Sequence, residues 1–177
     1  MLNNALHSTP LLKLMLLIAL WFGLVQGLVA GHHAEQTEPG DLGKQPWVFD
    51  IRGATLDNAN YRNTRWTGQF FQMVLMSLEP GEVIDLEVHD DHDQFFRVEA
   101  GTARVLMGKT ADEMSFDETA GSGYGIMIPA GYWHKIENAG DEALKVYTFY
   151  APAEHPAGTI HGRSDGVLSP APYEEAL

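Results

Sequence analysis

The sequence contains no cysteine among its 177 residues. Disulfide bonds, thiolate metal sites and a catalytic cysteine are therefore excluded, and any metal must be bound by imidazole nitrogen or by carboxylate, amide or backbone oxygen. Basic side chains are also scarce, because 11 lysines and arginines are outnumbered by 24 aspartates and glutamates, for a formal net charge of −13. A chain this acidic repels phosphate backbones and anionic lipid head groups. We expect no nucleic-acid partner.

Long apolar runs are confined to the first 30 residues. An uninterrupted apolar run covers residues 14–25, and small residues at Ala30 and Gly31 offer a cleavage site, a pattern typical of a signal peptide. We expect residues 1–30 to export the chain to the periplasm or the extracellular space, without membrane contact after cleavage. The alternative is an uncleaved membrane anchor through residues 14–30, which are nearly long enough to span a bilayer.

The rest of the chain divides into three segments. Residues 31–46 are polar, contain glycine and proline and have no apolar period, so we expect a linker. Residues 47–156 are expected to form one globular domain, because the length and a hydrophobic content of 45% leave little room for a second. Residues 157–177 are rich in proline, glycine and alanine and are expected to be an extended C-terminal tail.

Within the expected domain, short apolar runs alternate with turn residues, and no helix-period segment of useful length occurs. This pattern is typical of an all-β sandwich or barrel. The runs expected to be strands cover residues 47–51, 69–78, 83–89, 94–100, 103–107, 125–128, 133–138 and 143–150.

One of these runs, residues 83–89, carries ionisable groups where apolar ones are expected. With a period of two, Glu87 and His89 share one face of the strand and Ile84 lies on the other. One interpretation is a solvated polar face, and the other is an interior site. A hairpin through the acidic turn that follows would bring Gln94 beside His89.

A second stretch places a histidine on a strand after a Pro-x-Gly turn, and the two stretches together resemble the two-motif signature of the cupin superfamily. The first motif covers Gly81, Glu87, His89, Gln94 and Gly101, and the second covers Gly123, Pro129, Gly131, His134 and Asn138. The phrases "WTGQFFQMVLMSLEPGE", "DQFFRVEAG" and "YTFYAPAEHPAGTIH" are similar to small single-domain bacterial cupins labelled mannose-6-phosphate isomerase-like.

This resemblance implies a conical jelly-roll barrel of two antiparallel sheets, often a homodimer, with one divalent metal ion inside. Carried over position by position, the metal ligands are Glu87, His89, Gln94 and His134. Glu87 stands where most cupins have histidine and Gln94 where they have glutamate, so the ligand set keeps one negative charge. These ligands suit iron, manganese, zinc and nickel without distinguishing among them. The alternative is a barrel that has lost its metal.

Two classes of function fit this resemblance. One is a metal-dependent enzyme, dioxygenase- or isomerase-like, that acts on a small oxygenated molecule. The other is a non-catalytic cupin that binds a sugar or other small molecule and keeps a structural or vestigial metal site. Phosphosugar isomerase activity is disfavoured, because a sugar phosphate needs a cationic pocket and the chain is strongly acidic.

Aromatic side chains and the remaining histidines have less specific interpretations. Phe96 shares a strand face with Gln94 and is a candidate pocket residue, together with Trp133 and Tyr147, although core packing is the default for all three. His92 is expected to be a solvated turn residue. The tail histidines, His155 and His161, are expected to have a surface role.

Overall fold

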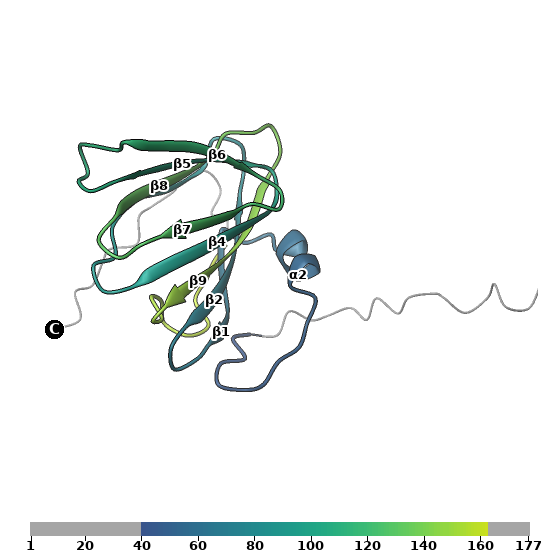
Figure 1. Ribbon diagram of the computed structural model, residues 1–177. Helices are drawn as coiled ribbons and strands as arrows, with labels where there is room; N and C mark the ends of the chain where they lie inside the picture. Colours follow the sequence, from purple (N-terminus) through teal and green to yellow (C-terminus); the bar gives the residue numbers. More distant parts are fainter. Residues whose placement is uncertain (1–39, 163–177) are drawn as a thin grey trace, which may run out of the picture. The chain divides into compact units, whose positions relative to one another are not determined.

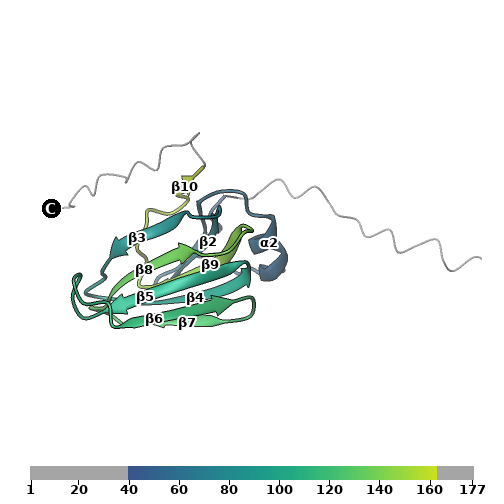
Figure 2. The ribbon, with the colours of Figure 1, turned by 90° about the horizontal axis from the view of Figure 1, so that it is seen from above.

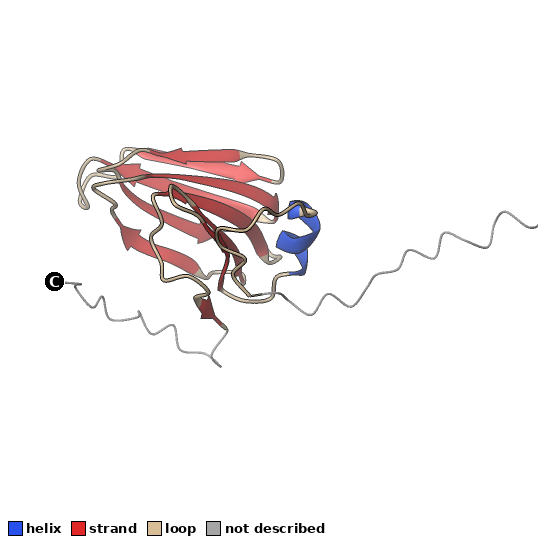
Figure 3. Ribbon diagram, turned by 90° about the horizontal axis from the view of Figure 1, so that it is seen from below, coloured by secondary structure: helices blue, strands red, loops and turns tan. Residues whose placement is uncertain are grey.

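The structure is a computed structural model that describes residues 40–162, and β-strands dominate this part of the chain (Figures 1 and 3). The helix is α2 (Ile51–Asp57). The strands are β1 (Arg62–Thr67), β2 (Gln72–Leu78), β3 (Val83–Glu87), β4 (Asp93–Ala100), β5 (Thr102–Gly108), β6 (Phe116–Gly121), β7 (Gly125–Ile128), β8 (Trp133–Asn138), β9 (Leu144–Ala151) and β10 (Ile160–His161).

The strands form two antiparallel sheets that pack against each other, as the view from above shows (Figure 2). One sheet has six strands in the order β10-β1-β2-β9-β4-β7, and the other has four in the order β3-β8-β5-β6. Side chains from both sheets fill the space between them, among them Val74, Ile84, Phe96, Val105, Ile136 and Val146. The predicted all-β jelly-roll barrel of two antiparallel sheets is confirmed.

Strand alternation decides which side chains enter this interior. In β9 the buried residues are Leu144, Val146, Thr148 and Tyr150, every second position. In β8 the same alternation buries His134 together with its aliphatic neighbour Ile136. An imidazole therefore occupies a core position, where an isolated charge would be costly.

The prediction of a strand at residues 47–51 was wrong. Asp50 accepts a hydrogen bond from the Gly53 N–H at 2.9 Å and caps the two-turn helix α2. Strands β1 and β6 were not predicted at all. Their sequences, "RNTRWT" and "FDETAG", are largely polar and lack the apolar alternation that marked the other strands.

The described chain extends beyond both expected borders of the domain. Residue Leu42, expected in the linker, donates its N–H to the Arg65 carbonyl at 2.9 Å. At the other end, β10 pairs with β1 through Asn63 and Ile160. The expected leader and the last 15 residues of the expected tail lie outside the described residues. Between residues 40 and 162, no helix has the length and hydropathy needed to cross a membrane.

Candidate metal centre

A β-bulge turns Glu87 into the barrel. Ile84 pairs with Ile136 and Glu87 pairs with His134, so β3 has one more residue than β8 between these two pairs. The bulge places Ile84, 1% exposed, and Glu87 on the same inner side and leaves Leu86 41% exposed. The predicted strict alternation over residues 83–89 was wrong, because it put Ile84 and Glu87 on opposite faces. With its side chain 16% exposed, Glu87 does not belong to a solvated face.

His134 enters from β8 and is fully buried. Its Nδ1 lies 3.1 Å from the Tyr132 carbonyl, which accepts the Nδ1–H and leaves Nε2 to bind a proton or a metal ion. Nε2 lies 3.2 Å from Glu87 Oε1. The turn before β8 requires Gly131, whose φ of +74° is poorly accessible to other residues. The Gly131 N–H donates to the His89 carbonyl at 2.8 Å, so the second motif is tied to the first.

His89 follows β3 directly and supplies the second imidazole. It is 9% exposed, its Nε2 lies 3.5 Å from Glu87 Oε1, and this nitrogen is buried without a hydrogen-bond partner. The ring centroids of His89 and His134 are 5.3 Å apart. A buried nitrogen without a partner is costly unless it binds a proton or a metal.

Ligand atoms of Glu87, His89 and His134 all lie within 4.8 Å of one another. Two ligand atoms that are each about 2.1 Å from a tetrahedral metal ion lie about 3.4 Å apart. The distances from the carboxylate to the two imidazoles match that separation. The geometry and the chemistry of this donor set therefore fit one divalent metal ion.

The electrostatics agree with a cation-binding site. Burial alone would raise the pKa of Glu87, but interactions with the nearby imidazoles of His134 and then His89 outweigh it and lower that pKa to about 2. Burial alone would lower the pKa of His89, but Glu87 and then Glu154 more than offset it and raise that pKa above its ordinary value. Glu87 therefore stays ionised while His89 holds a proton more tightly, and a metal ion would displace that proton.

Gln94 reaches the interior from the opposite sheet. The predicted hairpin was wrong, because β3 pairs with β8 whereas β4 pairs with β7 and β9. Gln94 is 2% exposed and donates its amide Nε2 to Thr148 Oγ1 at 3.1 Å. Its carbonyl Oε1 is buried without a partner. The free atom is thus the one that binds metals, consistent with a fourth ligand.

Comparison with known proteins identifies the family. A family model described as Cupin domain matches residues 74–150. The crystal structure of the Bacillus halodurans protein BH2720 is 44% identical over 70% of this chain and 94% of that chain, with a TM-score of 0.69. The Bacillus subtilis protein YrkC is 46% identical over 73% of this chain and 70% of its own length. Protein L612 of Acanthamoeba polyphaga mimivirus is 45% identical over 67% of this chain and 73% of its own length. The chain belongs to the cupin superfamily.

The predicted pocket aromatics are mostly not in the cupin interior. Phe96 is fully buried and packs in the core, but Trp133 and Tyr147 alternate with the buried residues of β8 and β9 and lie on the outer side. The prediction that Trp133 and Tyr147 line the pocket was therefore wrong. Tyr147 instead contacts Phe149 on the outer face of the six-stranded sheet, with ring centroids 5.7 Å apart.

Two histidines that were predicted to be solvent-exposed pack against this barrel, His92 as a buried residue and His155 as a partly buried one. His92 is 6% exposed, and its ring stacks on His89 with centroids 4.3 Å apart. His155 packs its ring edge-on against Tyr150 at 5.1 Å, and its Nε2 is buried without a hydrogen-bond partner. Sequence alternation gave no signal for either residue, because both lie in loops.

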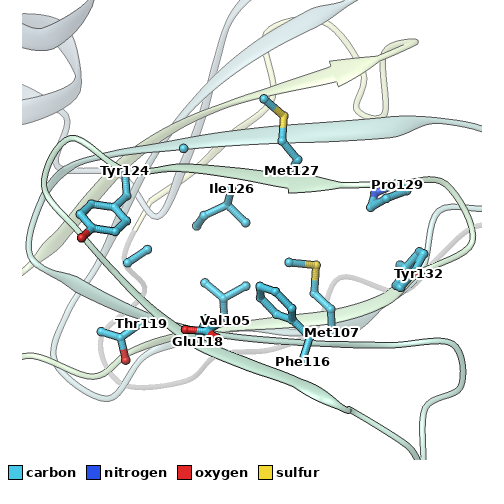
Figure 4. A pocket seen from close by; sticks show the side chains of 12 residues that line it. Val105, Met107, Phe116, Glu118, Thr119, Tyr124, Ile126, Met127, Pro129 and Tyr132 are labelled. Atoms are coloured by element: carbon cyan, nitrogen blue, oxygen red, sulfur yellow. The ribbon is translucent and has the colours of Figure 1, made fainter.

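A separate pocket of about 480 Å³ lies between β7 and the paired strands β5 and β6 (Figure 4). Ile126 points into it from β7, while Val105 and Met107 point into it from β5. Its walls are mostly apolar, and none of the four predicted metal ligands lines it. Sequence analysis did not identify this pocket.

Proposed function

We propose that this cupin is a metal-dependent enzyme that acts on a small oxygenated molecule. The observation that carries the proposal is the convergence of Glu87, His89 and His134 in the barrel interior. Two imidazoles and one carboxylate suit iron, manganese, zinc and nickel, and three protein ligands leave positions for Gln94 and a substrate oxygen.

A divalent metal bound there would supply a Lewis acid or a position for dioxygen. The chain's own residues prepare the site for it. Tyr132 fixes the protonated nitrogen of His134 through its carbonyl, and Thr148 holds the amide of Gln94 so that the oxygen stays free. Phe96 and Ile136, both nearly fully buried, exclude water on the core side.

The second candidate is a non-catalytic cupin that binds a sugar or another small molecule. The apolar pocket between β5, β6 and β7 favours it, because none of the predicted metal ligands lines this pocket. We also propose that, within the cupin superfamily, the protein is related to those labelled mannose-6-phosphate isomerase-like. Isomerisation of an unphosphorylated sugar is compatible with the acidic chain, whereas a sugar phosphate is not favoured.

Turnover measurements separate the two candidates. Wild-type protein loaded with Fe(II), Mn(II) or Zn(II) is incubated with small hydroxy acids, keto acids and sugars, and products and oxygen uptake are followed. We expect turnover that falls at least about 100-fold in His134→Ala, as for loss of a metal ligand. The matched control, His161→Ala, removes a histidine outside the site and retains activity. Calorimetric binding without turnover under every metal would support the second candidate instead.

We also propose that the protein is exported and functions as a homodimer. Export is supported by the apolar run at residues 14–25. A dimer is supported by exposed apolar side chains such as Phe70 and Phe71, which are 73% and 41% exposed. Mass spectrometry of protein from an exporting host should show a chain that starts near Gly31. An intact first residue in soluble cytoplasmic material would contradict export.

A further inference from the structure

A second group of potential metal ligands lies beside the candidate metal centre and shares His89 with it. Ligand atoms of His89, His92 and Glu154 all lie within 4.8 Å of one another. Glu154 comes from the segment after β9, more than 60 residues beyond His92 in the chain. The fold therefore builds this group from two distant loops.

His92 directs its Nε2 toward this group. Its Nδ1 lies 2.8 Å from Asp91 Oδ1, a distance at which Nδ1–H donates to the carboxylate and Nε2 is left to face Glu154. Nε2 is buried without a hydrogen-bond partner and lies 3.4 Å from Glu154 Oε2. A proton or a metal ion between the nitrogen and the carboxylate would satisfy both atoms.

Glu154 is held in position by the backbone of its own segment. The next residue, His155, accepts a hydrogen bond from Gln72 Nε2 at 2.7 Å and donates its N–H to Gln72 Oε1 at 3.0 Å. Farther on, the Gly158 N–H donates to Asp41 Oδ2 at 3.0 Å. The backbone segment that carries Glu154 is therefore held in place by contacts that do not involve the Glu154 side chain.

The imidazole of His89 lies between two carboxylates. Its Nε2 is 3.5 Å from Glu87 Oε1, and its Nδ1 is 3.8 Å from Glu154 Oε2. Both separations are close to the roughly 3.4 Å expected for two ligands of one tetrahedral ion. One ring thus offers one nitrogen to each of two three-residue groups.

We propose that His92 Nε2, Glu154 and His89 Nδ1 form a second divalent-cation site next to the first, with the His89 ring bridging two metal ions. Its two nitrogens and one carboxylate suit zinc, copper or nickel. Bridging converts the ring to imidazolate, and the proton that leaves passes to solvent. The second site depends on the proposed function only because both metal sites use His89.

Zinc content tests the proposal. The full chain is equilibrated with Zn(II), dialysed against a weak chelator and analysed for zinc per chain, with circular dichroism to verify folding. We expect His92→Asn and Glu154→Gln each to lose one ion per chain relative to wild type. Asp90→Asn is the matched control, because it changes an exposed carboxylate in the same loop as His92 and should lose none.

Two results would overturn the second site. One is unchanged zinc content in both His92→Asn and Glu154→Gln. The other is a single ion that disappears equally from these variants and from Glu87→Gln, which would show one site instead of two. Failure of the proposed function looks different: His134→Ala would then keep its zinc content while His92→Asn still lost one ion.

Discussion

At the scale of single residues, the central feature is a buried carboxylate between two imidazoles. Glu87 was identified from the motif spacing, and its inward position is confirmed. Its surroundings were not predictable, because a one-residue bulge in β3 changes which side chains share its face. No local property of "VIDLEVH" distinguishes a bulged strand from a regular one. His92 was predicted to be solvated and Glu154 was not singled out, because loop residues have no periodicity to reveal burial.

The exchanged pair Glu87 and Gln94 gives a residue-scale prediction. Glu87→Gln removes the single anionic ligand of the first site, so we expect metal affinity to fall by at least about 100-fold. The double variant Glu87→Gln with Gln94→Glu restores the charge in the position where most cupins have it, and much of the affinity should return. Competition with a chelator measures the affinity of the wild type, Glu87→Gln, Gln94→Glu and the double variant at one pH, because protons compete for the ligands.

The control for this exchange is Glu118→Gln, which makes the same chemical change at an exposed position on β6. It should leave affinity unchanged. A double variant no better than the weaker single variant would show that the two residues, which come from opposite sheets, do not share a metal ion.

His155 gives a pH prediction at the same scale. Burial first, and then the charge of Arg62, lower its pKa to about 3 in the folded protein, whereas an unfolded histidine titrates near 6.5. The unfolded chain therefore binds the additional proton between these values, and folding stability falls as the pH drops from 6.5 toward 3. The free energy of unfolding falls by a few kcal/mol, on the order of magnitude that such a pKa difference gives.

Replacing His155 with Gln should flatten this acid dependence. Urea unfolding of metal-free protein at pH 7.5 and pH 4.5 measures it, and His161→Gln, at a less buried histidine, serves as the control. An equally steep loss of stability in His155→Gln would assign the acid dependence to other groups.

At the scale of elements, turns and crossing strands place the site. The Pro-x-Gly turn before β8 was predicted, and the structure adds that it is hydrogen-bonded to His89 and, through the Ala130 N–H, to Asp93 at 2.9 Å. The predicted hairpin between Glu87 and Gln94 was wrong because the chain passes from one sheet to the other between β3 and β4. Hydrophobic periodicity identifies strands but does not specify their partners.

The segment after β9 gives a prediction at this scale. Gln72, which is fully buried, binds both backbone groups of His155, so Gln72→Ala leaves buried polar groups without partners. We expect the free energy of unfolding to fall by about 2–3 kcal/mol. Urea denaturation measures the loss. Gln69→Ala makes the identical change at an exposed position and should lower the free energy of unfolding by less than about 0.5 kcal/mol. Equal losses in the two variants would contradict the role of Gln72 in holding the segment after β9.

At the scale of the whole molecule, the jelly roll explains why a chain with few sequence signals builds a site. Glu87 and His134 come from one sheet and Gln94 from the other, and the two sheets share one core. The barrel and the four predicted ligand positions followed from a family resemblance. The predicted positions of Trp133 and Tyr147 failed because alternation within β8 and β9 turns them outward.

Anomalous diffraction from crystals of the metal-loaded protein, collected at the absorption edge of the bound metal, tests the central claim most directly. The account predicts a peak about 2.0–2.2 Å from ligand atoms of Glu87, His89 and His134. A protein that retains metal while the peak lies elsewhere, or crystals of metal-saturated protein with no peak among these three residues, would contradict it.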